Sequence, residues 1–348
     1  MKVLVTGASG FVGGHLVQKL LEKKYEVFCI CRKTSNLKHL ETLSYPPERV
    51  PRIGFTNLKF VTADLSNTSY NNTLKEVLKE VDYIYHLAGV IKAYSAEDYD
   101  KGNFGATRYF IEAVDNAKNK NLKRFLHLSS LAAAGPADDT KGISEESYCH
   151  PVSDYGKSKL KGENVVSGYK DSLPVTILRP PVVYGPRDSG LLFFFKIISY
   201  GIKPQFNPKK HISLIYVKDL VDAMILSAEN PQSIGQTYFV ANKDSYSINS
   251  IVDAISKVVN NNAVNIRLSD GVIQKVAGVY EGFYYLLGLE PTMINSQKAL
   301  ELSQDYWTCQ TKKIKMSIGF QTSVSLEAGV QETADCYLKN KWIRDCRR

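Results

Sequence analysis

Short apolar runs alternate with longer amphipathic stretches along the first half of this chain. After the run at residues 2–5, for example, apolar residues return at helical spacing as Val12, Leu16 and Leu20. We predict that the runs form buried parallel strands, at residues 2–5, 26–31, 58–61, 81–89, 124–130 and 173–181. Residues 99–113 predict a helix. Strands separated by helix-length segments indicate an α/β fold with a doubly wound parallel sheet and helices on both faces.

After the sixth predicted strand the alternation loosens. An apolar helix, a strand that runs into a helix, and another strand are predicted there, at residues 193–200, 212–223 and 235–241, and Ser247 caps a further helix. From about residue 260 the pattern becomes irregular and more aromatic. We therefore expect a sheet domain over residues 1–180, to which residues 212–241 return, and a smaller, mostly helical domain over residues 181–348.

The turn after the first strand has a glycine at every third position. Gly7 can take backbone angles that other residues avoid, Gly10 lets the main chain approach a phosphate, and Gly13 lets helix and strand pack closely. The unpaired amides of the following helix then face the anion. A nucleoside-triphosphatase loop would end in Gly-Lys-Ser/Thr, which Gly14 and His15 do not supply. The turn therefore predicts a Rossmann-type dinucleotide site rather than an ordinary glycine-rich turn.

The end of the second predicted strand favours NADP(H) over NAD(H). An NAD-preferring site places a carboxylate there, which accepts hydrogen bonds from the adenosine ribose. In this chain the position falls at Cys31, and Arg32 and Lys33 follow. A guanidinium can pair with a 2′-phosphate through two hydrogen bonds, whereas a carboxylate would repel it. NAD(H) stays the alternative, in which Arg32 and Lys33 are ordinary surface charges.

Three residues that lie far apart in the sequence form the candidate catalytic set. Tyr155 and Lys159 are four residues apart at the start of a predicted helix, so both side chains project from one face. An ammonium beside a phenol favours the phenolate, so we expect Lys159 to lower the Tyr155 pKa from its ordinary value of about 10. Ser130 ends the fifth strand and can polarise a substrate carbonyl by a hydrogen bond. The alternative role of Ser130 is to satisfy the backbone there.

Composition suits one large globular unit or two closely packed ones. The chain has 348 residues, of which 44% are hydrophobic and 23% are charged, and its formal net charge is +9. The basic residues are spread over predicted helix surfaces, and the densest run, residues 118–124, is typical of a helix end and a loop. No zinc-finger spacing or helix-turn-helix signal accompanies them. We expect no nucleic-acid partner.

Two apolar stretches and the cysteines indicate the cellular compartment in which we expect the protein. Lys196 ends the stretch at residues 191–195, and Glu281 with three glycines interrupts residues 276–289, so neither reaches the roughly 20 residues of a membrane span. Both stretches could line an apolar pocket or pack in the core, and the stretch at residues 276–289 could instead be a lid or a membrane contact. The six cysteines show no metal-ligand spacing, so we expect no metal. Because Met1 directly precedes the first strand, we expect no targeting segment and a reduced, cytoplasmic protein.

With these motifs the chain resembles an extended short-chain dehydrogenase/reductase of the epimerase/dehydratase type. The resemblance covers residues 2–241 and, more loosely, residues 318–342. It implies that Ser130, Tyr155 and Lys159 are catalytic. It also implies a set of cofactor contacts: Thr6, Gly7, Gly10, Phe11, Val12 and Gly13 at the pyrophosphate, Arg32 and Lys33 at the 2′-phosphate, Asp64 and Leu65 at the adenine, Leu87, Ala88 and Gly89 at the ribose-phosphate, with Asn103, Tyr155, Lys159, Pro180 and Val183 completing the set.

Departures from the family motifs narrow the substrate. Residues 131–132 are Leu-Ala where nucleotide-sugar 4,6-dehydratases carry an Asp-Glu pair, so dehydration is not expected. Val183 stands where sugar-nucleotide enzymes often have asparagine, and residues 212–217 lack their diphosphate-binding arginine. A diphosphate without these partners would be poorly held. The pattern is nearest to dihydroflavonol reductases and 3β-hydroxysteroid dehydrogenases, whose substrates are largely apolar.

We therefore expect an NADP(H)-dependent oxidoreductase that acts on a ketone or secondary alcohol of a mainly apolar small molecule. Hydride moves between the nicotinamide and the carbonyl carbon, Tyr155 handles the proton, Lys159 tunes it and Ser130 orients the oxygen. The alternative is a nucleotide-sugar epimerase with tightly bound NAD(P), which uses the same residues. A non-catalytic dinucleotide-sensing protein is less favoured, because the catalytic set is intact. Dimers are usual in the family, so a homodimer stays open.

Overall fold

A parallel sheet organises the first part of the chain. The computed structural model describes residues 1–44, 57–66, 70–260, 262–289 and 295–346. Within these residues the main sheet has the order β11-β6-β5-β4-β1-β2-β3, and every pairing in it is parallel. Its strands are β1 (Lys2–Thr6), β2 (Glu26–Cys31), β3 (Leu58–Thr62), β4 (Tyr83–His86), β5 (Arg124–Leu128), β6 (Val175–Arg179) and β11 (Thr237–Phe239). The strand order reverses between β1 and β4, which opens a ligand-binding crevice at the carboxyl ends of these strands.

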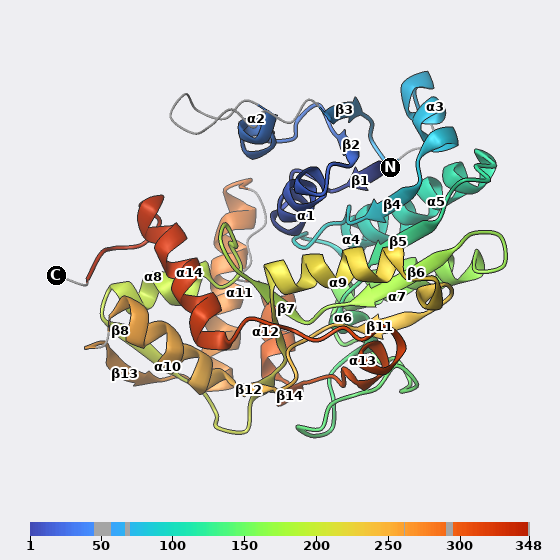
Figure 1. Cartoon of the computed structure of the whole chain (residues 1–348). Helices are drawn as coiled ribbons and strands as arrows, with labels where there is room; N and C mark the ends of the chain where they lie inside the picture. Colours follow the sequence, from blue (N-terminus) through green and yellow to red (C-terminus); the bar gives the residue numbers. More distant parts are fainter. Residues whose placement is uncertain (45–56, 67–69, 261, 290–294, 347–348) are drawn as a thin grey trace.

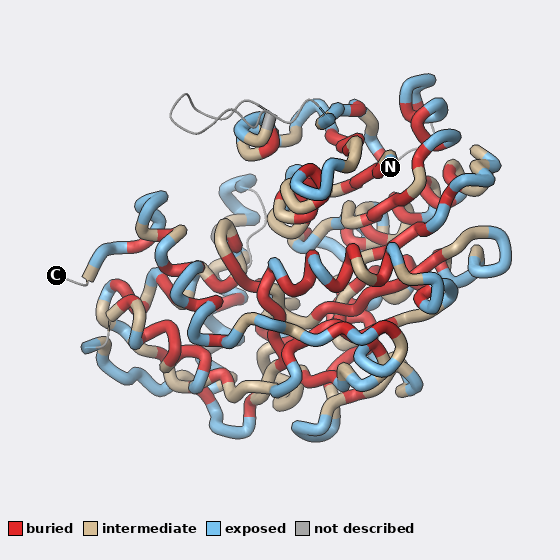
Figure 2. The backbone as a smooth tube through the Cα atoms, in the orientation of Figure 1, coloured by how far each residue is buried: buried red, intermediate tan, exposed pale blue. Residues whose placement is uncertain are grey.

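Helices cover both faces of this sheet, as predicted for a Rossmann-type fold. Successive residues of β1 point to opposite sides: Val3 and Val5 join one core cluster and Leu4 joins the other. The first cluster includes α1 (Phe11–Glu22) and α9 (Val217–Glu229), which lie side by side in Figure 1. The second face carries α3 (Asn72–Glu80), α5 (Ala106–Asn116) and α7 (Asp154–Gly168). Figure 2 shows the central strands of this sheet as buried, whereas the edge strand β3 is mostly exposed.

Several predicted boundaries differ from the structure. The strand predicted at residues 81–89 ends at His86, because the small residues 87–89 leave the sheet in irregular conformation. The run at residues 173–181 forms β6, and a separate strand, β7 (Val182–Tyr184), follows it. The predicted helix at residues 99–113 is present but is not regular. It comprises α4 (Ala96–Tyr99), a π-helical segment η1 (Asp100–Gly105) and α5.

The remaining elements pack beside the sheet at its carboxyl-terminal side (Figure 1). Within the described residues they include three small sheets, in the orders β10-β7, β12-β9-β14 and β13-β8. Their further strands are β8 (Ile202–Gln205), β9 (His211–Ile212), β10 (Leu214–Tyr216), β12 (Tyr246–Ser247), β13 (Val264–Arg267) and β14 (Tyr306–Trp307). The helices are α8 (Leu192–Ser199), α10 (Ile248–Val259), α11 (Asp270–Leu286), α12 (Ser296–Ser303), α13 (Lys312–Ile318) and α14 (Leu326–Lys339). Among the described residues after 260, where the sequence pattern is irregular, the structure therefore has four helices, α11 to α14.

The two apolar stretches noted in the sequence differ in burial. Leu191 and Phe195 lie in the core cluster formed by α8, α10 and α14, so core packing accounts for them. The second stretch lies mainly on α11, and most of its described side chains are exposed. In the described part of the chain, no helix is long and apolar enough to cross a membrane.

Candidate active site

The glycine turn between β1 and α1 is closed by very short backbone approaches. Gly7 has φ +68°, and a Cβ there would lie 2.8 Å from the Leu87 carbonyl carbon. A Cβ on Gly13 would lie 2.2 Å from the Gly7 carbonyl oxygen, so α1 packs directly on the turn. Gly10 is the N-cap of α1 and has no side chain with which to satisfy the first helical amides. These amides fit a phosphate group, as the sequence pattern predicts.

Thr6 serves the neighbouring loop rather than presenting its side chain at the surface. It is fully buried, and its hydroxyl oxygen accepts hydrogen bonds from the amides of Leu87 (3.1 Å) and Ala88 (3.0 Å). The Thr6 hydroxyl lies 2.9 Å from Nδ1 of His86, whose Nε2 lies 3.0 Å from the Thr107 hydroxyl. Burial lowers the His86 pKa to about 3, so the ring is neutral. Thr6 thus fixes residues 87–89, which are expected to flank the ribose-phosphate.

The adenine end of the predicted site lies at the ends of β2 and β3. Arg32 and Lys33 are exposed there, and so is the Asp64 carboxylate. Asp64 accepts a hydrogen bond from the Ser66 amide (2.9 Å), and this bond, with a smaller contribution from the Arg32 charge, lowers its pKa. Leu65 is buried in the core below. Arg32 and Lys33 are thus exposed cations at the place where the sequence analysis predicts a 2′-phosphate.

Arg187 is a cation near the glycine turn that the sequence analysis did not single out. It has φ +72°, and its Nη1 would lie 2.9 Å from a Cβ placed on Gly14 in α1. Its Nη2 is buried, and no hydrogen-bond partner for it occurs in the described part of the chain. Burial lowers the pKa of both neighbouring imidazoles, His15 and His39, to about 4. Arg187 is half-buried, and its guanidinium lies close enough to both neutral imidazoles for its charge to act on them.

The structure brings the three predicted catalytic residues together at the carboxyl edge of the sheet. Ser130 is the N-cap of the short helix α6 (Leu131–Ala134), and its oxygen accepts a hydrogen bond from the Ala132 amide (3.1 Å). The Ser130 hydroxyl also shares a hydrogen bond with the Tyr155 side chain, so the two hydroxyl groups lie side by side. Tyr155 and Lys159 project from the first turns of α7, and Lys159 Nζ donates a 2.7 Å hydrogen bond to the Leu128 carbonyl oxygen.

The expected lowering of the Tyr155 pKa is wrong for the protein alone. Burial raises this pKa well above its ordinary value, and a side-chain hydrogen bond with Ser130 opposes the rise only in part. Burial also lowers the Lys159 pKa to about 8, since an ammonium loses its hydration there. The phenol is therefore protonated at neutral pH. The ring of Tyr99 meets that of Tyr155 edge-on, with the centroids 6.0 Å apart.

A buried carboxylate beneath Lys159 was missed by the sequence analysis. Glu163 follows Lys159 by one helical turn, is 3% exposed, and raises the Lys159 pKa against the effect of burial. Arg179 donates to its carboxylate through Nη2 (2.6 Å) and through Nε, which is shared between both oxygens (3.0 and 3.1 Å). The Ser129 hydroxyl donates to the same carboxylate. The four-residue spacing from Lys159 could have indicated it.

Asn103 positions the loop that borders Lys159. The π-helical segment turns its side chain inward, where Oδ1 accepts a hydrogen bond from the Val90 amide (2.8 Å). Its amide nitrogen donates to the Val90 carbonyl and to the Ser158 hydroxyl, at 2.9 Å each. A Cβ on Gly89 would lie 2.7 Å from Asn103 Oδ1 and 3.9 Å from Lys159 Nζ. Only glycine fits at position 89, next to the ammonium.

A distant helix braces the start of α7. The Ser153 hydroxyl caps α7 by accepting from the Gly156 amide (3.1 Å), and it donates to Glu301 Oε1 on α12 (2.6 Å). The Asp154 amide donates to Gln297 Oε1, also on α12 (2.8 Å). The start of α7, which carries Tyr155, is therefore fixed by hydrogen bonds to α12.

The other predicted contacts lie along the same edge. Phe11 and Val12 are half-buried at the start of α1. Pro180 is buried, and its carbonyl accepts a 2.8 Å hydrogen bond from the Leu131 amide. Val183 is half-buried in β7. That these residues touch a cofactor stays a prediction.

A Rossmann-type sheet with a glycine turn after its first strand and a Ser-Tyr-Lys set at its carboxyl edge is typical of a class of dinucleotide-dependent enzymes. The chain belongs to the NAD dependent epimerase/dehydratase family, whose sequence model matches residues 3–241. The family resemblance inferred from the sequence is therefore confirmed.

Relatives within this family differ in the reactions that their names state. The chain is 29% identical over 300 residues to the uncharacterized UDP-glucose epimerase YtcB of Bacillus subtilis, covering 80% of this chain and 87% of that protein. It is 26% identical over 343 residues to the ceramide reductase of Caulobacter vibrioides, covering 98% and 96%. The UDP-glucuronic acid 4-epimerase of Bacillus cereus, solved with NAD, has a TM-score of 0.74 at 23% identity, over 98% of this chain and 100% of that one, and supports the fold.

Proposed function

We propose that this protein is an NADP(H)-dependent oxidoreductase that reduces a ketone, or oxidises a secondary alcohol, of a mainly apolar small molecule. The observation that carries the proposal is the set of the half-buried Ser130 and Tyr155 with the buried Lys159, in which Ser130 is followed at once by the apolar helix α6. All four residues of α6 are buried and none can transfer a proton. This position therefore offers no acid–base pair for the elimination of water.

The geometry suits proton transfer to a carbonyl oxygen. Ser130 donates a hydrogen bond to that oxygen, and Tyr155, which burial keeps protonated, donates the proton. Lys159 stands beside Gly89, where the ribose of the cofactor is expected, and is held there by the Leu128 carbonyl. NADPH, when bound, supplies the hydride.

The preference for NADP(H) rests on Arg32. The guanidinium is exposed at the end of β2 and, after the hydrogen bonds from Ser66, its charge also helps to lower the Asp64 pKa, so a second anion near it would be stabilised. Fluorescence titration should show that NADPH binds more tightly than NADH, and Arg32→Asp should reverse the order. Arg108→Asp, an exposed change on α5, is the control and should leave the order unchanged. Equal affinities in the unaltered protein would refute the assignment.

An epimerase with tightly bound NAD(P) is the second candidate. The relative named as a UDP-glucose epimerase and the solved UDP-glucuronic acid 4-epimerase favour it. The ceramide reductase and a 3-beta-hydroxysteroid dehydrogenase of Mycolicibacterium neoaurum, 23% identical over 97% of this chain and 91% of that protein, favour an apolar substrate. Stoichiometry separates the two candidates, because an epimerase regenerates its cofactor in every cycle.

The decisive experiment is a screen of carbonyl compounds and sugar nucleotides for net oxidation of NADPH. We expect turnover with apolar ketones, which Tyr155→Phe should lower by at least about 100-fold without weakening NADPH binding. Tyr148→Phe, at an exposed site, is the matched control. Interconversion of sugar nucleotides without net NADPH consumption would establish the epimerase instead. Tight NADPH binding without any turnover would favour a dinucleotide-sensing role.

The cytoplasm is the proposed compartment. All six cysteines are free thiols, which suits a reducing environment. A homodimer is also proposed, because dimers are usual in the family. Light scattering of the purified protein, which measures its molecular mass, tests this proposal.

A further inference from the structure

Helix α11 presents an apolar face to solvent. Val276, Val279 and Leu286 are 58%, 76% and 83% exposed, respectively. They are three and seven residues apart, so they lie on one side of the helix. We call this side, with Val272 and Lys275, the outer face. The buried Ala277 and the carboxylate-bearing Glu281 lie on the opposite side. Figure 2 shows one end of this helix as largely exposed. A surface helix ordinarily turns its polar residues toward solvent, whereas α11 turns apolar residues toward solvent.

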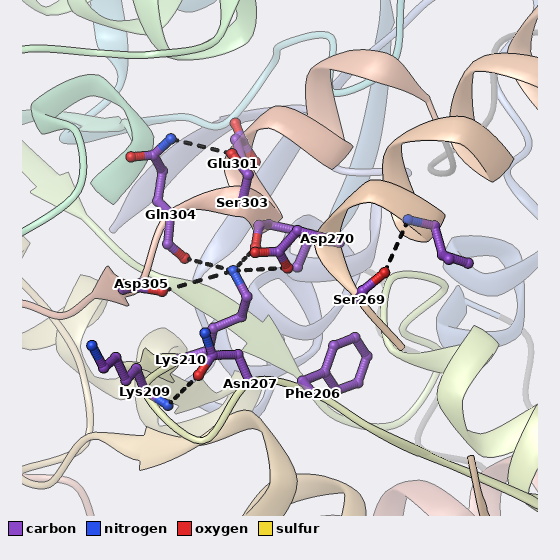
Figure 3. A network of polar contacts seen from close by, with 12 residues as sticks. Phe206, Asn207, Lys209, Lys210, Ser269, Asp270, Glu301, Ser303, Gln304 and Asp305 are labelled. Carbon is purple, nitrogen blue, oxygen red and sulfur yellow. Dashed lines mark hydrogen bonds and ion pairs between the residues drawn. The ribbon is translucent and has the colours of Figure 1, made fainter. Parts of the chain in front are cut away.

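The helix is held at both ends, so its exposed face is not the result of a loose segment. At the start of α11, the buried Lys210 forms an ion pair with Asp270 (3.2 Å) and donates to the Leu302 carbonyl (2.6 Å), a network drawn in Figure 3. Beyond the last turn, the Tyr94 hydroxyl donates to the Leu289 carbonyl (2.9 Å). The ring of Tyr94 also meets that of Tyr285 edge-on at 5.3 Å.

The charges on α11 favour an anionic, apolar occupant. Lys275 is exposed on the outer face and, with Val276, Val279 and Tyr280, lines a shallow groove. Both acidic residues of the helix are engaged on the inner side: Asp270 pairs with Lys210, and Glu281 accepts a 2.9 Å hydrogen bond from the Ser296 amide. The whole chain carries a formal net charge of +9. A lysine with an apolar stem between valines suits an anionic headgroup above acyl chains.

A second copy of the chain fits this face less well. In a two-fold dimer each outer face would meet the same surface of its partner. The Lys275 ammonium groups would then be drawn out of water together, with no acidic side chain on the outer face to pair with either. The anionic lipid surface meets the same lysine with opposite charge.

The inner side of α11, opposite the outer face, packs on α12, where Glu281 accepts a hydrogen bond from the Ser296 amide. Helix α12 in turn holds Ser153 and Asp154, which precede Tyr155. We propose that the outer face of α11 docks on an anionic lipid membrane, from which the apolar substrate reaches Tyr155. The route of the substrate rests on the proposed function, whereas membrane binding itself does not.

Vesicle sedimentation without cofactor or substrate tests the docking. The probes are vesicles of phosphatidylcholine alone and of phosphatidylcholine with phosphatidylglycerol. We expect the unaltered protein to bind the anionic vesicles more tightly, and less so as salt is added. Val279→Glu and Leu286→Glu should each lower the partition coefficient at least about tenfold. Lys275→Glu should weaken binding to anionic vesicles more than to neutral ones.

Met316→Glu is the matched control, because Met316 is 75% exposed on a different helix, α13, and should leave vesicle binding unchanged. Circular dichroism and NADPH titration verify that each variant is folded. Failure of the unaltered protein to bind vesicles, or equal binding by Leu286→Glu, would overturn the docking. So would a fall in oligomer mass caused by Val279→Glu without any vesicle binding, which would identify a second copy as the occupant.

Failure of docking and failure of the proposed function give different results. Vesicle binding that depends on Leu286, with no turnover of any ketone, would support the docking and remove the oxidoreductase. Turnover of water-soluble ketones without vesicle binding would do the reverse. If both proposals hold, Leu286→Glu should lower turnover of a vesicle-embedded ketone at least about tenfold and leave that of a soluble ketone unchanged.

Discussion

Replacing Lys159 by methionine should stabilise the protein while it abolishes the reaction. The side chain is 5% exposed, and burial lowers its pKa from 10.5 to about 8. Since each unit of pKa corresponds to about 1.4 kcal/mol, the buried ammonium costs about 3 kcal/mol of folding free energy at neutral pH. Methionine removes this cost but loses the 2.7 Å hydrogen bond to the Leu128 carbonyl, which contributes about 1 kcal/mol. The expected net gain is about 2 kcal/mol.

The stability difference between Lys159→Met and the unaltered protein should depend on pH in a defined direction. Below the folded pKa of about 8, both the folded and the unfolded chain bind the proton on Lys159, and the full cost is present. As the pH rises from about 8 toward 10.5, only the unfolded chain keeps the proton, so the cost falls. The advantage of Lys159→Met should therefore be greatest at neutral pH and, above 10.5, give way to a loss of about 1 kcal/mol from the missing hydrogen bond.

Urea unfolding followed by circular dichroism, on protein freed of dinucleotide, measures the free energy of unfolding at each pH. Lys161→Met is the matched control: its ion pair with Asp100 lies at the surface of the same helix and contributes little. A Lys159→Met protein that is no more stable than the unaltered one at neutral pH would refute the reasoning. A stability gain that persists unchanged at high pH would refute it too, because burial of charge could not then be the cause.

Two further substitutions probe the elements that hold the site. Glu163→Gln leaves the buried Arg179 without its ionic partner, so we expect a loss of about 3–5 kcal/mol in urea unfolding; the exposed Glu76→Gln should change little. A Cβ at position 13 would lie 2.2 Å from a carbonyl oxygen, so Gly13→Ala should weaken NADPH binding at least about tenfold in fluorescence titration. Gly168→Ala, where a Cβ meets open space, should leave it unchanged.

The features that the sequence predicts well are local ones. The strand runs, the glycine turn and the Tyr155–Lys159 spacing each depend on residues within a few positions, and the structure has the sheet where these patterns predict it. The π-helical turn at Asn103 and the brace from Glu301 to Ser153 were not predicted. Periodicity carries no information on a contact between residues so far apart in the chain.

The apolar stretch on α11 shows a different limit. A run of valine, tyrosine and leucine predicts burial, and the sequence favoured either a pocket wall or the core. The structure buries Ala277 and leaves Val279 and Leu286 outside. Composition alone does not tell which side of an apolar helix packs, because that depends on where Lys210 and Tyr94 hold its ends.

Burial sets the protonation of the two catalytic groups in opposite ways. It raises the pKa of Tyr155, which keeps the phenol as an acid, and it lowers that of Lys159 toward neutrality. Glu163 works against the second effect and keeps the ammonium charged at neutral pH. Under the proposed function, a protonated phenol would donate to a carbonyl oxygen, which suits reduction. The positive charge of an oxidised nicotinamide would favour the phenolate that alcohol oxidation requires. The redox state of the cofactor, rather than a change in the protein, would then select the direction of the reaction.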